Sequence, residues 1–62
     1  MVFKTKNSTY YVDTNRNIIT GGKLGNKAYK FSNGIFMVGM PGRCILEDGR
    51  SLTTGIIIKY LG

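Results

Sequence analysis

The chain is built from short runs in which apolar and polar residues alternate. Residues 2–6 alternate with Phe3 on the apolar side, and residues 9–12 and 18–20 resume the pattern after polar segments. A period of two places successive side chains on opposite faces of a strand, and no stretch shows a sustained apolar period of 3.6 residues. These runs predict an N-terminal hairpin or meander whose core face carries Phe3.

The last third of the chain predicts a hairpin. Asp48-Gly49 lies between the apolar runs 43–46 and 51–54. A type I′ turn needs positive φ at both central residues, which makes Asp-Gly a strong hairpin signal. With a two-residue loop, Ile45 lies opposite Leu52 and the two share a face.

A second hairpin is predicted at Asn33-Gly34, which separates the apolar runs 28–31 and 35–38. Residues 39–42 then interrupt the sheet, because proline cannot donate to a strand ladder and glycines flank it on both sides. Strands that recur at intervals of about 8–12 residues with turn chemistry between them indicate an all-β protein.

The predicted fold is a small SH3-like or OB-like barrel of five to six short antiparallel strands, with no long helix. One domain spans residues 1–62. A two-sheet sandwich is disfavoured because it typically takes about 100 residues.

Residues 21–27 combine glycines with Lys23 and Lys27. Glycine-rich loops can direct backbone N–H groups toward an anion, and the lysines add charge. The segment is not a P-loop, since no Gly-Lys-Ser/Thr occurs. A disordered connection between two halves of the sheet remains an equal alternative.

A chain of 62 residues is short of core. Cys44 is the only cysteine, so no internal disulfide forms, and we expect its thiol to act as a small apolar filler in a strand. Oligomerisation is the remaining source of stability. The run 56–58 is apolar on both faces of its strand, and the predicted subunit interface consists of Ile56, Ile57, Ile58 and Tyr60.

The net charge of +6, from nine basic and three acidic residues, favours anionic partners. The alternative is that this charge only keeps a small domain soluble. No apolar run approaches the roughly 20 residues of a membrane span, and the first residues do not resemble a signal peptide. We therefore expect no membrane partner and an intracellular protein in a reducing setting.

Catalytic chemistry is not expected. The chain contains no histidine, and Glu47-Asp48 is explained as a strand end followed by a turn residue. One cysteine and three carboxylates do not predict a metal site. The sequence thus indicates a binding protein with no catalytic residues, metal or cofactor.

Basic and aromatic side chains supply the candidate binding site. Arginine chelates phosphate bidentately and a tyrosine ring can stack on a base. Aromatic residues of small β-proteins more often belong to the core, which favours tyrosine over phenylalanine as a ligand contact. The predicted ligand-binding residues are Tyr11, Lys23, Lys27, Tyr29, Lys30, Arg43 and Arg50.

Two segments carry a resemblance to a known group. Residues 5–13, Thr-Lys-Asn-Ser-Thr-Tyr-Tyr-Val-Asp, and residues 49–56, Gly-Arg-Ser-Leu-Thr-Thr-Gly-Ile, resemble very small phage-encoded β-proteins. Those proteins tend to open with Thr-x-Asn-Ser-x-Tyr-x-Val and to end with Thr-Ser-x-Val. The resemblance implies a phage accessory protein of anti-defence type in the host cytoplasm, and it carries over no binding residue.

Two functional hypotheses follow. In the first, a homo-oligomer sequesters a phosphorylated nucleotide signal in pockets between its subunits. In the second, the chain is a small basic nucleic-acid-binding barrel, or an inhibitor that docks on the nucleic-acid site of a host defence protein.

Overall fold

The computed structural model describes residues 1–62 as one antiparallel sheet of seven strands in the order β6-β5-β4-β3-β2-β1-β7. The strands are β1 (Val2–Lys4), β2 (Thr9–Asp13), β3 (Ile18–Gly21), β4 (Tyr29–Ile35), β5 (Pro41–Leu46), β6 (Ser51–Ile56) and β7 (Lys59–Tyr60), and a short 3-10 helix, η1 (Gly22–Leu24), follows β3. The all-β prediction is confirmed, with seven strands where five to six were expected. The sheet does not close, since β6 and β7 form its two edges.

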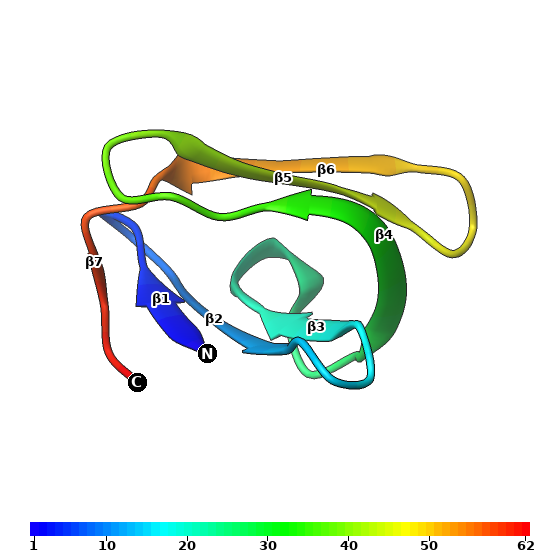
Figure 1. The fold of residues 1–62 in the computed structure, drawn as a ribbon. Coiled ribbons are helices and arrows are strands. Elements are labelled where there is room, and N and C mark those ends of the chain that lie inside the picture. The colour runs from blue at the N-terminus through cyan, green and yellow to red at the C-terminus, as the bar shows by residue number, and fades with distance from the viewer.

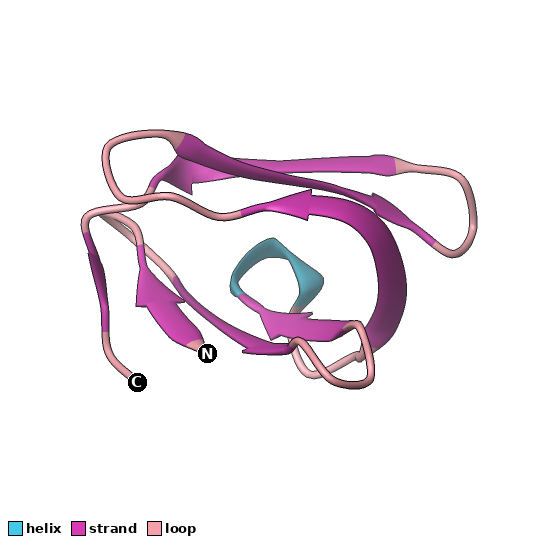
Figure 2. Cartoon of the chain, viewed as in Figure 1, coloured by secondary structure: helices cyan, strands magenta, loops and turns pink.

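The sheet folds over on itself into two layers because β4 bends. The first residues of β4 pair with β3 and its later residues pair with β5, so that one strand contributes to both layers (Figure 1). The only helical element, η1, is a single short turn (Figure 2). No helix in the structure is long and apolar enough to cross a membrane.

The core fills the space between the layers. The expected core face of the first strand is confirmed, since Phe3 is fully buried, and its ring stacks on Tyr10 with 5.2 Å between centroids. Cys44 is also buried, as expected of an apolar filler, and burial raises the pKa of its thiol. The buried apolar residues are Phe3, Tyr10, Val12, Ile19, Cys44, Leu46, Leu52 and Ile57.

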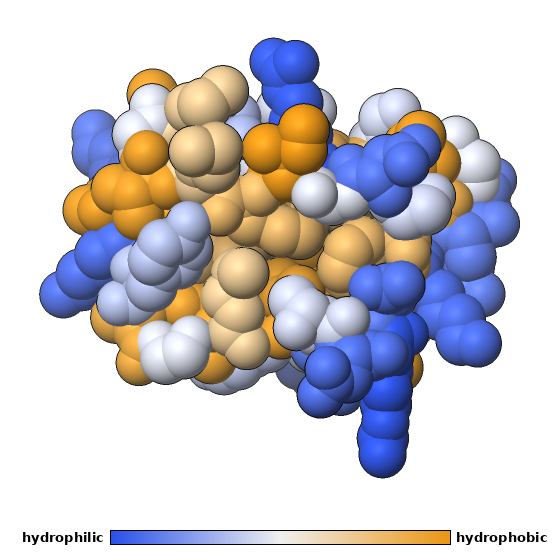
Figure 3. Space-filling view, in the orientation of Figure 1, coloured by the Kyte–Doolittle hydropathy of each residue, from blue (hydrophilic) through white to orange (hydrophobic).

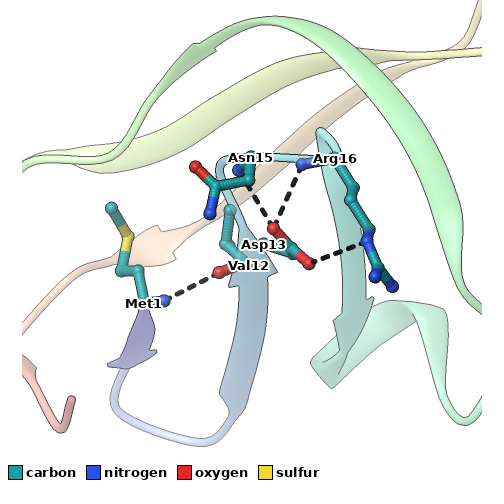
Figure 4. A network of polar contacts seen from close by, with 5 residues as sticks. All are labelled: Met1, Val12, Asp13, Asn15 and Arg16. Atoms are coloured by element: carbon teal, nitrogen blue, oxygen red, sulfur yellow. Dashed lines mark hydrogen bonds and ion pairs between the residues drawn. The ribbon is translucent and has the colours of Figure 1, made fainter.

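Local polar contacts fix the turn between β2 and β3. Asp13 Oδ1 accepts hydrogen bonds from the backbone N–H groups of Asn15 at 2.9 Å and Arg16 at 3.1 Å (Figure 4). The N-terminal ammonium of Met1 donates to the Val12 carbonyl oxygen at 2.8 Å, which ties the start of the chain to β2. These contacts support the predicted N-terminal meander and hold the Asp13 carboxylate in its own turn.

The Asp48-Gly49 hairpin forms, but the predicted register is wrong by one residue. Cys44, not Ile45, lies opposite Leu52, and the loop consists of Glu47, Asp48 and Gly49. Gly49 has φ +89°, which suits a three-residue loop with glycine in the left-handed position. The shift buries Leu46 and Leu52 together and leaves Ile45 on the outer face.

The hairpin predicted at Asn33-Gly34 does not form. The segment stays within β4, where Asn33 has φ +54° and the pairing with β5 shifts its register. A Cβ added to Gly34 would lie 2.6 Å from the Phe31 ring and 2.7 Å from the Phe36 ring. Positive φ and close aromatic packing therefore build a bulge in a bent strand, not a chain reversal.

Candidate functional site

A groove of about 600 Å³ runs between the β1–β2 turn and the end of β6. It joins two segments far apart in sequence, together with one lysine of the loop that follows β3. The lining residues are Thr5, Lys6, Asn7, Ser8, Tyr10, Lys23, Thr53, Thr54, Gly55, Ile56 and Ile58.

Lys23 reaches the groove because Tyr10 supports the turn that carries it. The Tyr10 ring lies directly under η1, where a Cβ on Gly22 would stand 2.1 Å from Tyr10 Cζ. The Tyr10 hydroxyl accepts a hydrogen bond from the Lys23 backbone N–H at 3.1 Å. The Lys23 ammonium in turn donates to the Thr53 carbonyl oxygen at 2.9 Å.

The loop 21–27 is therefore ordered. The Gly21 N–H donates to the Gly25 carbonyl oxygen, and the Gly25 N–H donates to the Gly22 carbonyl oxygen, both at 3.1 Å. Thr20 Oγ1 donates to the Lys27 carbonyl oxygen at 2.9 Å. The glycines serve this compact turn, since Gly21 and Gly22 both have positive φ.

Two of the three threonines that line the groove, Thr5 and Thr54, have structural roles. Thr54 Oγ1 accepts from the Gly42 N–H at 2.9 Å and donates to the Gly55 carbonyl oxygen at 2.7 Å. Thr5 is equally buried, and its N–H donates to the Ser8 carbonyl oxygen at 2.9 Å. The groups open to a ligand are instead the ammonium groups of Lys6 and Lys23 and the exposed Asn7 side chain.

No carboxylate compensates the two lysines of the groove. The acidic residues are Asp13, Glu47 and Asp48, and none of them lines it. Lys23 has only a neutral carbonyl oxygen as its partner. The groove is therefore a region of unbalanced positive charge that is suited to an anion.

A second basic site surrounds Tyr29, which is half-buried. The Lys27 ammonium lies 5.4 Å from the centre of the Tyr29 ring, and the Arg50 guanidinium lies 5.6 Å from it. Arg50 Nε also donates to Asp48 Oδ2 at 2.7 Å. The hydrogen bond with Asp48 raises the pKa of Arg50. We call Lys27, Tyr29 and Arg50 the tyrosine cluster.

The seven predicted ligand residues do not form one site. Lys23 lies in the groove, and the tyrosine cluster unites three others. Tyr11 is exposed on β2 beside Thr20, Lys30 is exposed on β4, and Arg43 is exposed on β5 opposite Thr53.

One of the four predicted interface residues, Ile57, lies in the core and not at the surface. Ile57 is fully buried in the core, because its backbone is held between Gly39 and Met40 by two hydrogen bonds of 2.9 Å. Ile56 and Ile58 are exposed, as is Tyr60, whose hydroxyl donates to the Phe36 carbonyl oxygen at 2.6 Å. The isoleucine run therefore contributes to the core through Ile57 only and leaves Ile56 and Ile58 exposed on the other face.

Sequence reasoning missed Lys6 and Asn7, together with the β6 wall of the groove. Residues 5–13 and 49–56, two segments far apart in the sequence, contain most of the lining. The fold brings the two segments together, and neither segment contains a pattern that predicts this contact.

The chain matches no protein-family model, no curated protein and no solved structure. No group of three or more His, Cys, Asp or Glu side chains is placed to hold a metal ion.

Proposed function

We propose that the protein is a non-enzymatic phage accessory protein of anti-defence type that sequesters a phosphorylated nucleotide signal in the host cytoplasm. The observation that carries this proposal is a groove with two lysines and no carboxylate. A volume of about 600 Å³ is typical of sites for small organic ligands.

Two kinds of surface in the groove match the two parts of a nucleotide. Lys6 and Lys23 supply charge for phosphate, which lysine binds as a point charge. Ile56 and Ile58 offer an apolar wall against which a base can lie. As part of this proposal, we assign the curled sheet to the small SH3-like or OB-like barrels, with β4 as the strand that turns the corner.

Isothermal titration calorimetry with mononucleotides, dinucleotides and cyclic nucleotides tests the proposal. We expect at least one nucleotide to bind stoichiometrically, and Lys6→Ala and Lys23→Ala each to weaken it about tenfold, because each removes a charge-assisted hydrogen bond. Lys30→Ala is the matched control, since Lys30 is exposed and does not line the groove. Absence of heat with every nucleotide, or equal weakening by Lys30→Ala, would refute the proposal.

The second candidate is a small basic nucleic-acid-binding protein, or an inhibitor that docks on the nucleic-acid site of a host protein. The tyrosine cluster favours it, because it places two cations beside one aromatic ring. In that case log K for an oligonucleotide falls linearly with log salt, and Arg50→Ala lowers the slope. A flat salt dependence counts against this function.

A further inference from the structure

Exposed apolar side chains gather at one end of the molecule. Met37, Val38, Met40, Ile56 and Ile58 are each at least half exposed, and we call them the apolar end. The side of the molecule where the loop 36–40 and the β6–β7 junction lie shows a concentration of apolar residues (Figure 3). Contiguous apolar surface of this kind marks an interaction site more often than isolated exposed residues do.

Backbone hydrogen bonds bring the two segments of the apolar end together. The Gly39 N–H donates to the Ile57 carbonyl oxygen, and the Ile57 N–H donates to the Met40 carbonyl oxygen, both at 2.9 Å. The loop segment that carries Val38 and Met40 therefore runs beside the segment that carries Ile56 and Ile58.

Charged side chains border the apolar end, since Lys59 follows Ile58 and Lys6 lines the groove with Ile56 and Ile58, but none belongs to the two stretches that form it. No Lys, Arg, Asp or Glu occurs in residues 31–42 or in residues 51–58, the two stretches that meet there. An acidic partner would find no opposite charge on this surface. A second copy of this chain, in spite of its net charge of +6, would meet no like charge from these segments.

The small core supplies a reason for self-association. Only 11 of 62 residues are buried, and domains of this size commonly gain stability by oligomerisation. A standard interface takes about 800 Å² from each partner, a modest part of the 4116 Å² of accessible surface. Methionine adapts its shape readily, so Met37 and Met40 can pack against their own counterparts.

We propose that two copies of the chain associate through the apolar end. Because Ile56 and Ile58 belong both to this surface and to the groove, the second copy lies beside the apolar wall of the groove and closes that side of it. The pairing itself stands without a ligand, and only its contribution to the groove rests on the proposed function.

Light scattering and sedimentation of the full chain over a range of concentrations test the pairing. We expect a particle of twice the 6.9 kDa chain mass. Met40→Glu should raise the dissociation constant about thirtyfold or more, because it places a charge in the apolar centre of the contact. Ile45→Glu is the matched control, since Ile45 is 39% exposed but lies on the outer face of β5, outside the apolar end.

A wild-type chain that stays monomeric at every concentration overturns the pairing, whether or not any variant folds. A Met40→Glu protein that remains dimeric, or an Ile45→Glu protein that dissociates to the same extent, also overturns it. Calorimetry separates the two proposals. A dimer that binds no nucleotide removes the proposed function and leaves the pairing intact, whereas a monomer that binds nucleotide does the reverse.

Discussion

The groove and the tyrosine cluster are both basic, but their cationic side chains have different partners. In the tyrosine cluster, Arg50 Nε lies 2.7 Å from Asp48 Oδ2, and the guanidinium lies beside the Tyr29 ring. The positive charge of Arg50 is therefore compensated within the chain. In the groove, Lys23 contacts only a backbone carbonyl oxygen and Lys6 has no carboxylate beside it. The number of basic residues therefore does not show where positive charge is left uncompensated, whereas the absence of a nearby carboxylate does.

The two regions also differ in the space around their glycines, because Gly22 lies against the Tyr10 ring and Gly49 has no neighbour within 4 Å of an added Cβ. The substitution with the largest expected loss of stability tests this difference. Gly22→Ala, in the turn that carries Lys23 to the groove, adds a methyl group 2.1 Å from Tyr10 Cζ at a residue with φ +49°. We expect a loss of about 3 kcal/mol or more in the free energy of unfolding, from backbone strain and overpacking together.

Gly49→Ala, in the hairpin loop beside the tyrosine cluster, is the control for that variant. Its φ is +89° and nothing lies within 4 Å of the added Cβ, so that only backbone strain of about 1 to 2 kcal/mol is expected. Urea unfolding measures both variants. Equal losses would mean that contact with Tyr10 does not constrain the Lys23 turn.

Tyr10→Phe should have an intermediate effect. It keeps the buried ring but removes the hydroxyl that accepts the Lys23 N–H. We expect a loss of about 1 kcal/mol in the free energy of unfolding, with faster amide exchange at Lys23. Tyr11→Phe, at an exposed neighbour, should change neither thermal unfolding nor that exchange rate. Unchanged protection of the Lys23 amide in Tyr10→Phe would exclude the hydroxyl as its support.

The smallest expected effect concerns Asp48 in acid. Hydrogen bonds from the Arg50 backbone N–H and then from its side chain hold the pKa of Asp48 below its ordinary value of 3.8. The folded pKa is thus the lower one, so the contribution of Asp48 to stability is complete above about pH 3.8 and is lost as the pH falls through the folded value.

Thermal unfolding of the wild type and of Asp48→Asn across the acid range measures that contribution. The wild type should be slightly the more stable near neutral pH, and the difference should shrink below pH 3.8. A difference that persists unchanged in strong acid would assign it to something other than this carboxylate.

Alternation and turn chemistry predicted most of the strands, but not every place where the chain reverses. Asp48-Gly49 and Asn33-Gly34 look alike as sequences, since both supply residues that tolerate positive φ. Asp48-Gly49 lies in the loop of a hairpin, whereas Asn33-Gly34 lies within a bent strand. The rings of Phe31 and Phe36 pack around Gly34, and the Phe36 ring also stacks on Phe3 with 5.4 Å between centroids. That second contact joins distant parts of the chain, and no local pattern contains it.

The candidate site was harder to predict than the fold for the same reason. Charge and residue type identified Lys23 and the members of the tyrosine cluster, but they did not separate the two regions. Lys6 was not selected, because its importance depends on a wall that β6 supplies from the other end of the chain. The burial of Ile57 likewise depends on a loop that was expected to be a strand, since residues 36–38 lie outside β4.

The contact between Lys23 and Thr53 has a consequence for solubility. β6 is an edge strand, and an uncovered edge offers its backbone groups to the strand of any other chain, which is a common route to aggregation. The Lys23 ammonium donates a hydrogen bond to one of those oxygens, the Thr53 carbonyl, and places a positive charge directly on the edge. Another chain that added a strand there would have to displace this ammonium and, if it were a copy, bring its own lysine against it. The same lysine that makes the groove attractive to anions thus discourages fibril-like growth of the sheet.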